Sequence, residues 1–126
     1  MNRNFIVVDD DQTNNFLCMK IITTVFPDSN VQTFSDPETA LVYINNMFGN
    51  ATDGNAVLFL DINMPTLSGW DFLEEFERFD TGIKGQLKIY MLTSSVDERD
   101  KDRAAENKNV CGYIEKPLSK EMIRNM

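Results

Sequence analysis

The sequence contains no histidine among its 126 residues. This absence excludes imidazole acid–base catalysis, histidine-activated nucleophiles and histidine-ligated zinc. Cysteine is scarce as well, because only Cys18 and Cys111 are present and both lie in apolar stretches. We expect both to be buried free thiols in a reducing compartment. Any chemistry of this chain must therefore use carboxylates, hydroxyls, lysine and backbone groups.

Long hydrophobic runs are also missing. No apolar segment approaches the roughly 20 residues that a transmembrane helix requires. The run Phe5–Val8 ends at acidic residues and is too short for the core of a secretory signal. A net charge of −8 argues against direct binding to nucleic acid or to anionic membranes. We therefore expect a cytoplasmic protein without membrane or nucleic-acid partners.

What is present is enough for one ordinary core. Hydrophobic residues make up 42% of the chain and aromatic residues 10%. This composition and the length predict a single folded domain over residues 1–126.

Along the chain, short apolar or alternating runs alternate with segments that have helical periodicity. Strands are predicted at 4–8, 30–34, 56–60, 87–92 and 110–114. Helices are predicted at 13–25, at 35–48, after Gly69 as far as Phe79, at 96–107 and at 118–126. A polar loop at 50–55 precedes the third strand, and a connection at 81–85 precedes the fourth.

This alternation predicts an α/β fold. Right-handed crossovers between parallel strands place helices on both faces of one sheet. We expect a flavodoxin-like open sheet of five parallel strands in the order 2-1-3-4-5. In the first helix, Leu17, Ile21 and Val25 form the expected inward stripe, with Cys18 and Ile22 beside it. The segment 96–107 is polar, and its few apolar anchors suit a movable element.

Polar residues follow four of the five predicted strands. They are Asp9-Asp10-Asp11 after the first, Asp61 after the third, Thr93-Ser94 after the fourth and Lys116-Pro117 after the fifth. Since the carboxyl ends of neighbouring parallel strands share one edge, these side chains should meet in a single crevice.

The chemistry of this set points to phosphoryl transfer. Clustered carboxylates repel one another unless a cation joins them, and oxygen ligands without histidine or cysteine favour Mg²⁺. Asp61 is the natural nucleophile, because a carboxylate can form an acyl phosphate. Thr93 and Lys116 can bind the other phosphoryl oxygens.

Each residue alone also has a simpler explanation. Asp11 fits a helix cap, Asp61 a turn, and Thr93-Ser94 another cap, while Lys116 could be a solvated charge. Four such coincidences at one edge of one sheet are improbable together. The joint interpretation is therefore favoured, with Asp11 assigned to helix capping.

Four motifs carry a family resemblance. They are Val7-Val8-Asp9-Asp10, Leu60-Asp61-Ile62-Asn63-Met64-Pro65 with Ser68-Gly69, Met91-Leu92-Thr93-Ser94, and Gly112-Tyr113-Ile114-Glu115-Lys116-Pro117. In order and spacing they closely resemble the receiver domain of bacterial two-component response regulators, the chemotaxis receiver type included. The resemblance implies that Asp61 takes a phosphoryl group from a phosphohistidine on a sensor histidine kinase or a phosphotransfer protein. It implies a signalling domain rather than an enzyme.

The resemblance also implies a metal site. Mg²⁺, with Mn²⁺ as an alternative, would be bound by Asp10, Asp61 and the backbone carbonyl of Asn63. Asp9 would act largely through water. The peptide bond before Pro117 is cis in the family, which would direct Lys116 into the site.

A conformational switch is implied in the same way. Thr93, with Ser94 beside it, would move toward the phosphoryl group, and Tyr113 would turn inward to fill the space. The equilibrium of segment 96–107, the fifth strand and the last helix would then shift. Asn63 and Ser95 occupy the positions that tune the phosphoryl lifetime in the family.

Two rival families fit parts of the sequence. A haloacid-dehalogenase-type phosphatase would use Asp9 in the segment Asp9–Thr13 as its nucleophile. Such an enzyme also needs a later acidic motif, and this sequence supplies no convincing one. A flavodoxin would need a phosphate loop after the first strand, where three acids stand instead. A receiver that has lost phosphorylation is disfavoured by the intact site residues. The cognate kinase, the downstream protein or appended output domain, and dimerisation stay open.

Overall fold

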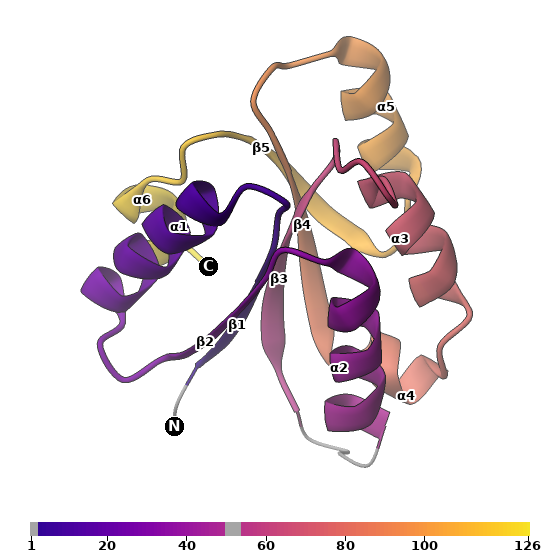
Figure 1. Ribbon diagram of the computed structural model, residues 1–126, viewed down its shortest axis with the longest axis horizontal. Coiled ribbons are helices and arrows are strands. Elements are labelled where there is room, and N and C mark those ends of the chain that lie inside the picture. Colours follow the sequence, from indigo (N-terminus) through magenta and orange to yellow (C-terminus); the bar gives the residue numbers. More distant parts are fainter. Residues whose placement is uncertain (1–2, 50–53) are drawn as a thin grey trace.

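The computed structural model describes residues 3–49 and 54–126, so the predicted loop at 50–55 lies mostly outside the described residues. Its strands are β1 (Asn4–Val8), β2 (Asn30–Phe34), β3 (Ala56–Asp61), β4 (Leu87–Thr93) and β5 (Val110–Glu115). All pairings are parallel, in the order β2-β1-β3-β4-β5 (Figure 1). The predicted fold class is confirmed.

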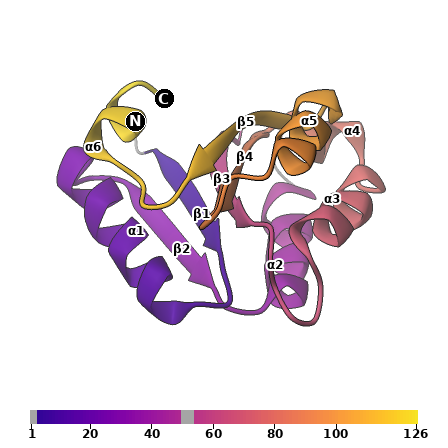
Figure 2. The same ribbon diagram turned by 90° about the horizontal axis from the view of Figure 1, so that it is seen from above.

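Helices cover both faces of the sheet. α1 (Gln12–Val25) and α6 (Lys120–Arg124) lie on one face. The other face carries α2 (Pro37–Gly49), α3 (Gly69–Glu77), α4 (Thr81–Lys84) and α5 (Glu98–Glu106), as Figures 1 and 2 show. No helix in the described part of the chain is both long enough and apolar enough to cross a membrane.

Alternating strand residues divide the core into two clusters. In β1, Ile6 and Val8 join the cluster under α2 and α3, whereas Phe5 and Val7 join the one under α1 and α6. β3 and β4 contribute to both clusters in the same way. Strands buried on both faces explain why these segments read as continuous apolar runs.

The stripe predicted for α1 is partly wrong. Cys18 and Ile22 are the buried pair, with exposed fractions of 2% and 0%, while Leu17 is 48% exposed. α1 is rotated about its axis relative to the prediction, because Asn15 also lies on its buried side. The Asn15 side-chain amide donates to the carbonyls of Asp9 and Phe34 at 2.8 and 3.3 Å. A buried polar residue of this kind leaves no hydrophobic signal in the sequence.

The prediction of two buried cysteines holds only for Cys18, because Cys111 is exposed. Val110 pairs with Ile89 and Gly112 pairs with Tyr90, so Cys111 is the additional residue of a β-bulge. Both thiols are free, and burial raises the pKa of Cys18 to about 11.

Five helices were predicted, and the described residues contain a sixth in the connection expected at 81–85. This one-turn helix, α4, starts where the Asp80 carbonyl accepts from the amides of Ile83 and Lys84. Ile83 is its single buried residue. One apolar anchor cannot produce a helical period, so the sequence pattern could not reveal it.

The helix of segment 96–107 is as weakly anchored as the sequence indicated. α5 buries only Ala104, and Val96 before it is 48% exposed. α6 buries Ile123, while Met122 is 38% exposed.

Candidate functional site

Three aspartates meet at the carboxyl edge of the sheet. Asp9 follows β1 and Asp61 ends β3, two strands that pair side by side up to Val8 and Leu60. Asp9 and Asp61 are 0% and 5% exposed, whereas Asp10 is exposed. One carboxylate oxygen from each lies within 4.8 Å of the others. The cluster predicted from the strand ends is therefore formed.

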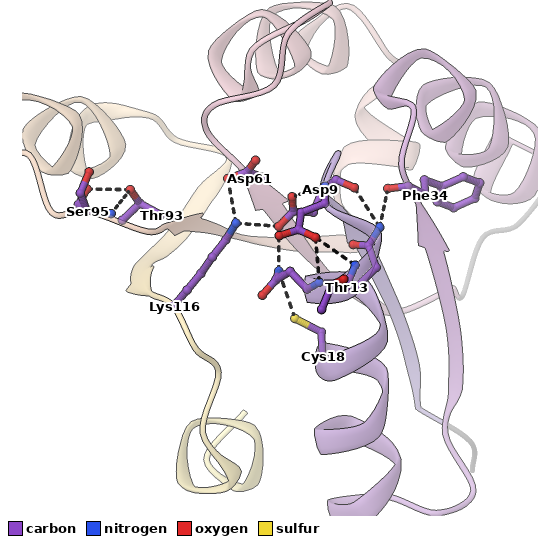
Figure 3. A network of polar contacts seen from close by, with 11 residues as sticks. Asp9, Thr13, Cys18, Phe34, Asp61, Thr93, Ser95 and Lys116 are labelled. Atoms are coloured by element: carbon purple, nitrogen blue, oxygen red, sulfur yellow. Dashed lines mark hydrogen bonds and ion pairs between the residues drawn. The ribbon is translucent and has the colours of Figure 1, made fainter.

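Asp9 is held by three donors. Its Oδ1 accepts from the backbone amide of Asp11 at 2.9 Å. Its Oδ2 accepts from the Asn14 side-chain amide and from Lys116 Nζ, both at 2.7 Å. This buried carboxylate is therefore fixed in orientation by its neighbours (Figure 3).

Lys116 connects the two buried aspartates. Besides Asp9, its ammonium lies 3.2 Å from Asp61 Oδ1, and its side chain is 18% exposed. Its backbone amide donates to the Thr93 carbonyl at 2.7 Å. The Lys116–Pro117 peptide bond is cis, as the family resemblance implied. Figure 3 shows the lysine reaching across from β5 to the aspartates.

The cluster contains three carboxyl groups but only one ammonium group among the residues described above. Burial, followed by the charge of Asp9, raises the pKa of Asp61 to about 6, although Lys116 acts in the opposite direction. Burial alone would lower the pKa of Lys116, but Asp9 and Asp61 raise it overall. Carboxylates brought together against their own repulsion, with oxygen ligands only, fit a hard divalent cation such as Mg²⁺ or Mn²⁺.

Asp11 has a different task from its two neighbours. Its Oδ1 accepts from the amides of Thr13 and Asn14 at 2.9 and 3.4 Å, so that it caps α1. The prediction that Asp11 is a helix cap is confirmed.

The hydroxyl residues at the end of β4 and just after it are only partly in the crevice. Thr93 is 1% exposed, and its hydroxyl donates to the Ser95 carbonyl at 2.7 Å and accepts from the Ser95 amide at 3.2 Å (Figure 3). Ser94, Ser95 and Asn63 are exposed. Thr93 is thus buried at the predicted position, with its hydroxyl engaged by the following loop.

Tyr113 links β5 to the start of α5. It is half-buried and packs against the core cluster that includes Ala104. Its hydroxyl accepts from the backbone amide of Asp97, the N-cap of α5, at 3.5 Å. A strand residue beside the site therefore contacts the start of a helix that buries a single residue.

Sequence reasoning missed Asn14 and Asn15. Both side chains donate hydrogen bonds to Asp9: Asn14 to its carboxylate and Asn15 to its backbone carbonyl. Neither lies in a motif, and their roles depend on the rotation of α1, so no signal in a single sequence could have found them.

Comparisons with known proteins agree with this geometry. The family model of the response regulator receiver domain matches residues 5–126. The chain is similar to a two-component response regulator from Cytophaga hutchinsonii, with 27% identity, a TM-score of 0.88, and 98% and 92% of the two chains covered. No curated protein matches.

More distant similarities show the fold alone. A response regulator receiver protein from Dyadobacter fermentans has 24% identity and a TM-score of 0.88 over 98% of this chain and 93% of its own. The chemotaxis protein CheY4 from Vibrio cholerae has 20% identity and a TM-score of 0.78 over 99% and 95%.

Proposed function

The chain belongs to the response regulator receiver domain family, the phosphoacceptor signalling domains of two-component systems, and from this premise we propose that Asp61 is its phosphoacceptor. One observation carries the assignment. Asp61 is a buried carboxylate that lies beside the ammonium of Lys116 and within metal-bridging distance of Asp9 and Asp10.

The reaction is a transfer from a phosphohistidine to Asp61. A carboxylate oxygen of Asp61 attacks phosphorus, an O–P bond forms and the P–N bond breaks. The electron pair of the broken bond stays on the imidazole nitrogen, which takes a proton from solvent. Receiver domains interact with a histidine kinase or another phosphodonor, and we propose a sensor histidine kinase or a histidine phosphotransfer protein here.

Receiver domains bind Mg²⁺ at an acidic pocket, and this cluster fits that ion. We propose Asp10, Asp61 and the backbone carbonyl of Asn63 as direct ligands. Asp9 acts through water, because both of its oxygens are already engaged by protein donors. When bound, the metal compensates the charge of the phosphoryl oxygens.

Lys116 and Thr93 bind oxygens of the phosphoryl group. The ammonium that now contacts Asp61 can bind a phosphoryl oxygen in a charge-assisted hydrogen bond. The Thr93 hydroxyl exchanges its bond with Ser95 for another oxygen, with Ser94 beside it. Asn63 and Ser95, both exposed next to the site, set how fast water removes the group.

Tyr113 reports the change to the surface. Movement of the Thr93 loop opens space into which the ring turns, and the Asp97 contact at the start of α5 is lost. The phosphoryl group shifts the balance between two arrangements of the α5–β5–α6 face, which a downstream protein or an appended output domain then recognises. The chemistry is limited to the domain's own phosphorylation and dephosphorylation.

The test is phosphorylation by phosphoramidate in the presence of Mg²⁺, followed by intact-mass analysis. We expect one phosphoryl group on the original protein and none on Asp61→Asn or in EDTA. Asp11→Asn is the matched control, because this aspartate of the same edge caps α1 and should leave labelling intact. Labelling that persists in Asp61→Asn, or none on the original protein, would contradict the proposal.

No observation favours the alternative phosphatase with Asp9 as nucleophile. Asp9 is fully buried, and both of its oxygens accept hydrogen bonds from the protein.

A further inference from the structure

Asn14 is the neutral side chain that donates to Asp9 in the charged cluster. Its side-chain nitrogen lies 2.7 Å from Asp9 Oδ2, the oxygen that also accepts from Lys116 at 2.7 Å. The other oxygen of Asp9 is taken by the Asp11 amide. Asn14 and Lys116 therefore share one acceptor atom.

The Asn14 side chain is itself fixed. It is half-buried in the first turn of α1, and its amide also donates to Cys18 Sγ one turn later at 3.6 Å. Its backbone amide belongs to the cap made by Asp11. Since capping uses the backbone, the side chain is free for Asp9, and its loss should leave α1 folded.

Sharing an acceptor has a consequence for Lys116. The lysine divides its ammonium between Asp9 at 2.7 Å and Asp61 at 3.2 Å. A buried carboxylate needs donors, and one that loses a neutral donor holds the remaining cation more strongly. With Asn14 in place, Asp9 has a further hydrogen-bond donor, so Lys116 can contact Asp61 as well as Asp9.

We propose that Asn14 is a positioning residue for phosphorylation of Asp61. It holds Asp9 in the orientation that shares Lys116 between the two aspartates, and thereby keeps the ammonium available for the incoming phosphoryl group. The inference rests on the proposed function, because it concerns the rate of the same reaction.

Two variants of Asn14 separate this role from a structural one. Asn14→Leu removes the donor at similar size, and Asn14→Asp keeps the size and adds a charge that the N-terminus of α1 favours. Asn46→Leu is the matched control, because Asn46 is an exposed helical asparagine on α2.

The first measurement compares phosphorylation with Mg²⁺ binding. At saturating Mg²⁺, we expect the rate with phosphoramidate to fall about tenfold in Asn14→Leu, the value of a hydrogen bond to a charged group. Asn14→Asp should fall at least as far, and Asn46→Leu should not change. The Mg²⁺ dissociation constant of Asn14→Leu, measured by calorimetry, should stay that of the original protein, since Asp10 and Asp61 are intact.

The second measurement needs no metal and no phosphodonor. In Mg²⁺-free protein with nitrogen-labelled lysine, the ammonium signal of Lys116 should shift in Asn14→Leu and stay in place in Asn46→Leu. This signal reports the environment of Lys116 directly, even if the protein were never phosphorylated.

The outcomes distinguish the two claims. If the original protein takes up no phosphoryl group, the proposed function fails. If the original protein is phosphorylated and both Asn14 variants react as fast as it does, only the role of Asn14 is refuted. An equal loss of rate and Mg²⁺ affinity with an unmoved Lys116 signal would make Asn14 merely structural, and would also overturn the inference.

Discussion

At the scale of single residues, the site depends on one cation between two buried anions. Among the described residues, Lys116 is the cation that forms ion pairs with Asp9 and Asp61. An ion pair away from water is costly to break on one side, because the remaining charge keeps its desolvation penalty. Lys116 therefore has a structural effect that can be measured without any phosphodonor.

Replacement of this lysine should destabilise the metal-free protein. In EDTA we expect Lys116→Met to lower the free energy of unfolding by roughly 2–3 kcal/mol, allowing for its partial exposure. Mg²⁺ should stabilise this variant more than the original protein, since the ion takes over the missing positive charge. Urea denaturation with and without Mg²⁺ measures both effects.

Lys120→Met, at an exposed position in α6, is the control and should behave like the original protein. An unchanged stability of Lys116→Met in EDTA would mean that its ion pairs are not formed in solution.

The sequence predicted the charged residues of the cluster but not the asparagines that orient them. Asp9, Asp61 and Lys116 were recognisable because each directly follows or ends a strand. Asn14 and Asn15 act through side-chain directions that only the packed helix defines. Residue type and spacing thus predicted which charged residues meet at the edge of the sheet, whereas their hydrogen bonds to Asn14 and Asn15 depend on how α1 packs.

At the scale of elements, α5 is held mainly by polar contacts. Ala104 is its only buried residue. Trp70 of α3 donates from its indole nitrogen to Asp100 at 3.2 Å, and the guanidinium of Arg103 lies 4.6 Å from the centre of the Trp70 ring. A helix attached in this way can change position at small cost, as a switching element must.

Loss of the Trp70–Asp100 bond should therefore loosen α5. In Asp100→Ala we expect amide hydrogens of α5 to exchange about fivefold faster, which corresponds to one hydrogen bond of about 1 kcal/mol. Fluorescence of Trp70, the only tryptophan of the sequence, should change as well. Asp102→Ala on an exposed position of the same helix is the control. Equal exchange in the two variants would show that Trp70 does not restrain α5.

Glu77, at the opposite end of α3, contacts residues of α4 and of the turn before β5. Its carboxylate accepts from Asn109 before β5 and pairs with Lys108 at 3.0 Å and with Lys84 of α4 at 3.2 Å. These contacts, that of Asn109 foremost, lower the pKa of Glu77 from its ordinary 4.5 to about 2. The charged form of Glu77 therefore stabilises the folded protein.

The sign of this shift gives a pH dependence. A carboxyl group with a lowered folded pKa stabilises the protein above its unfolded pKa, and this contribution is lost as pH falls toward the folded value. Glu77→Gln should thus be less stable than the original protein at neutral pH, and the difference should shrink below about pH 4.5. Glu75→Gln, which removes only an exposed pair with Arg78, should change little. A difference that is constant from neutral to acid pH would contradict the assignment.

At the scale of the whole molecule, one sheet supports both the core and the site. β1, β3 and β4 contribute to the clusters on both faces, and the same strands end at the acidic crevice. This continuity supports our proposal that residues 1–126 form a single receiver domain. It also means that the site is positioned by the most deeply buried part of the chain.

The fold was predictable because its signal is repeated. Five apolar strands separated by helix-period segments leave few arrangements, and the observed strand order is the expected one. The predictions that failed concern local details: the rotation that exposes Leu17, the bulge at Cys111 and the short helix around Ile83. Each is decided by local hydrogen bonds or by strand register, which a hydrophobic pattern does not encode.

The central claim is that the phosphoryl group is carried by Asp61. An acyl phosphate can be reduced by borohydride, which converts the labelled aspartate to homoserine. After reaction with phosphoramidate and Mg²⁺, peptide mass analysis should find homoserine at position 61 and unmodified aspartate at positions 9, 10 and 11. Homoserine at position 9, or at none of these positions in a protein that has gained a phosphoryl group, would contradict the account.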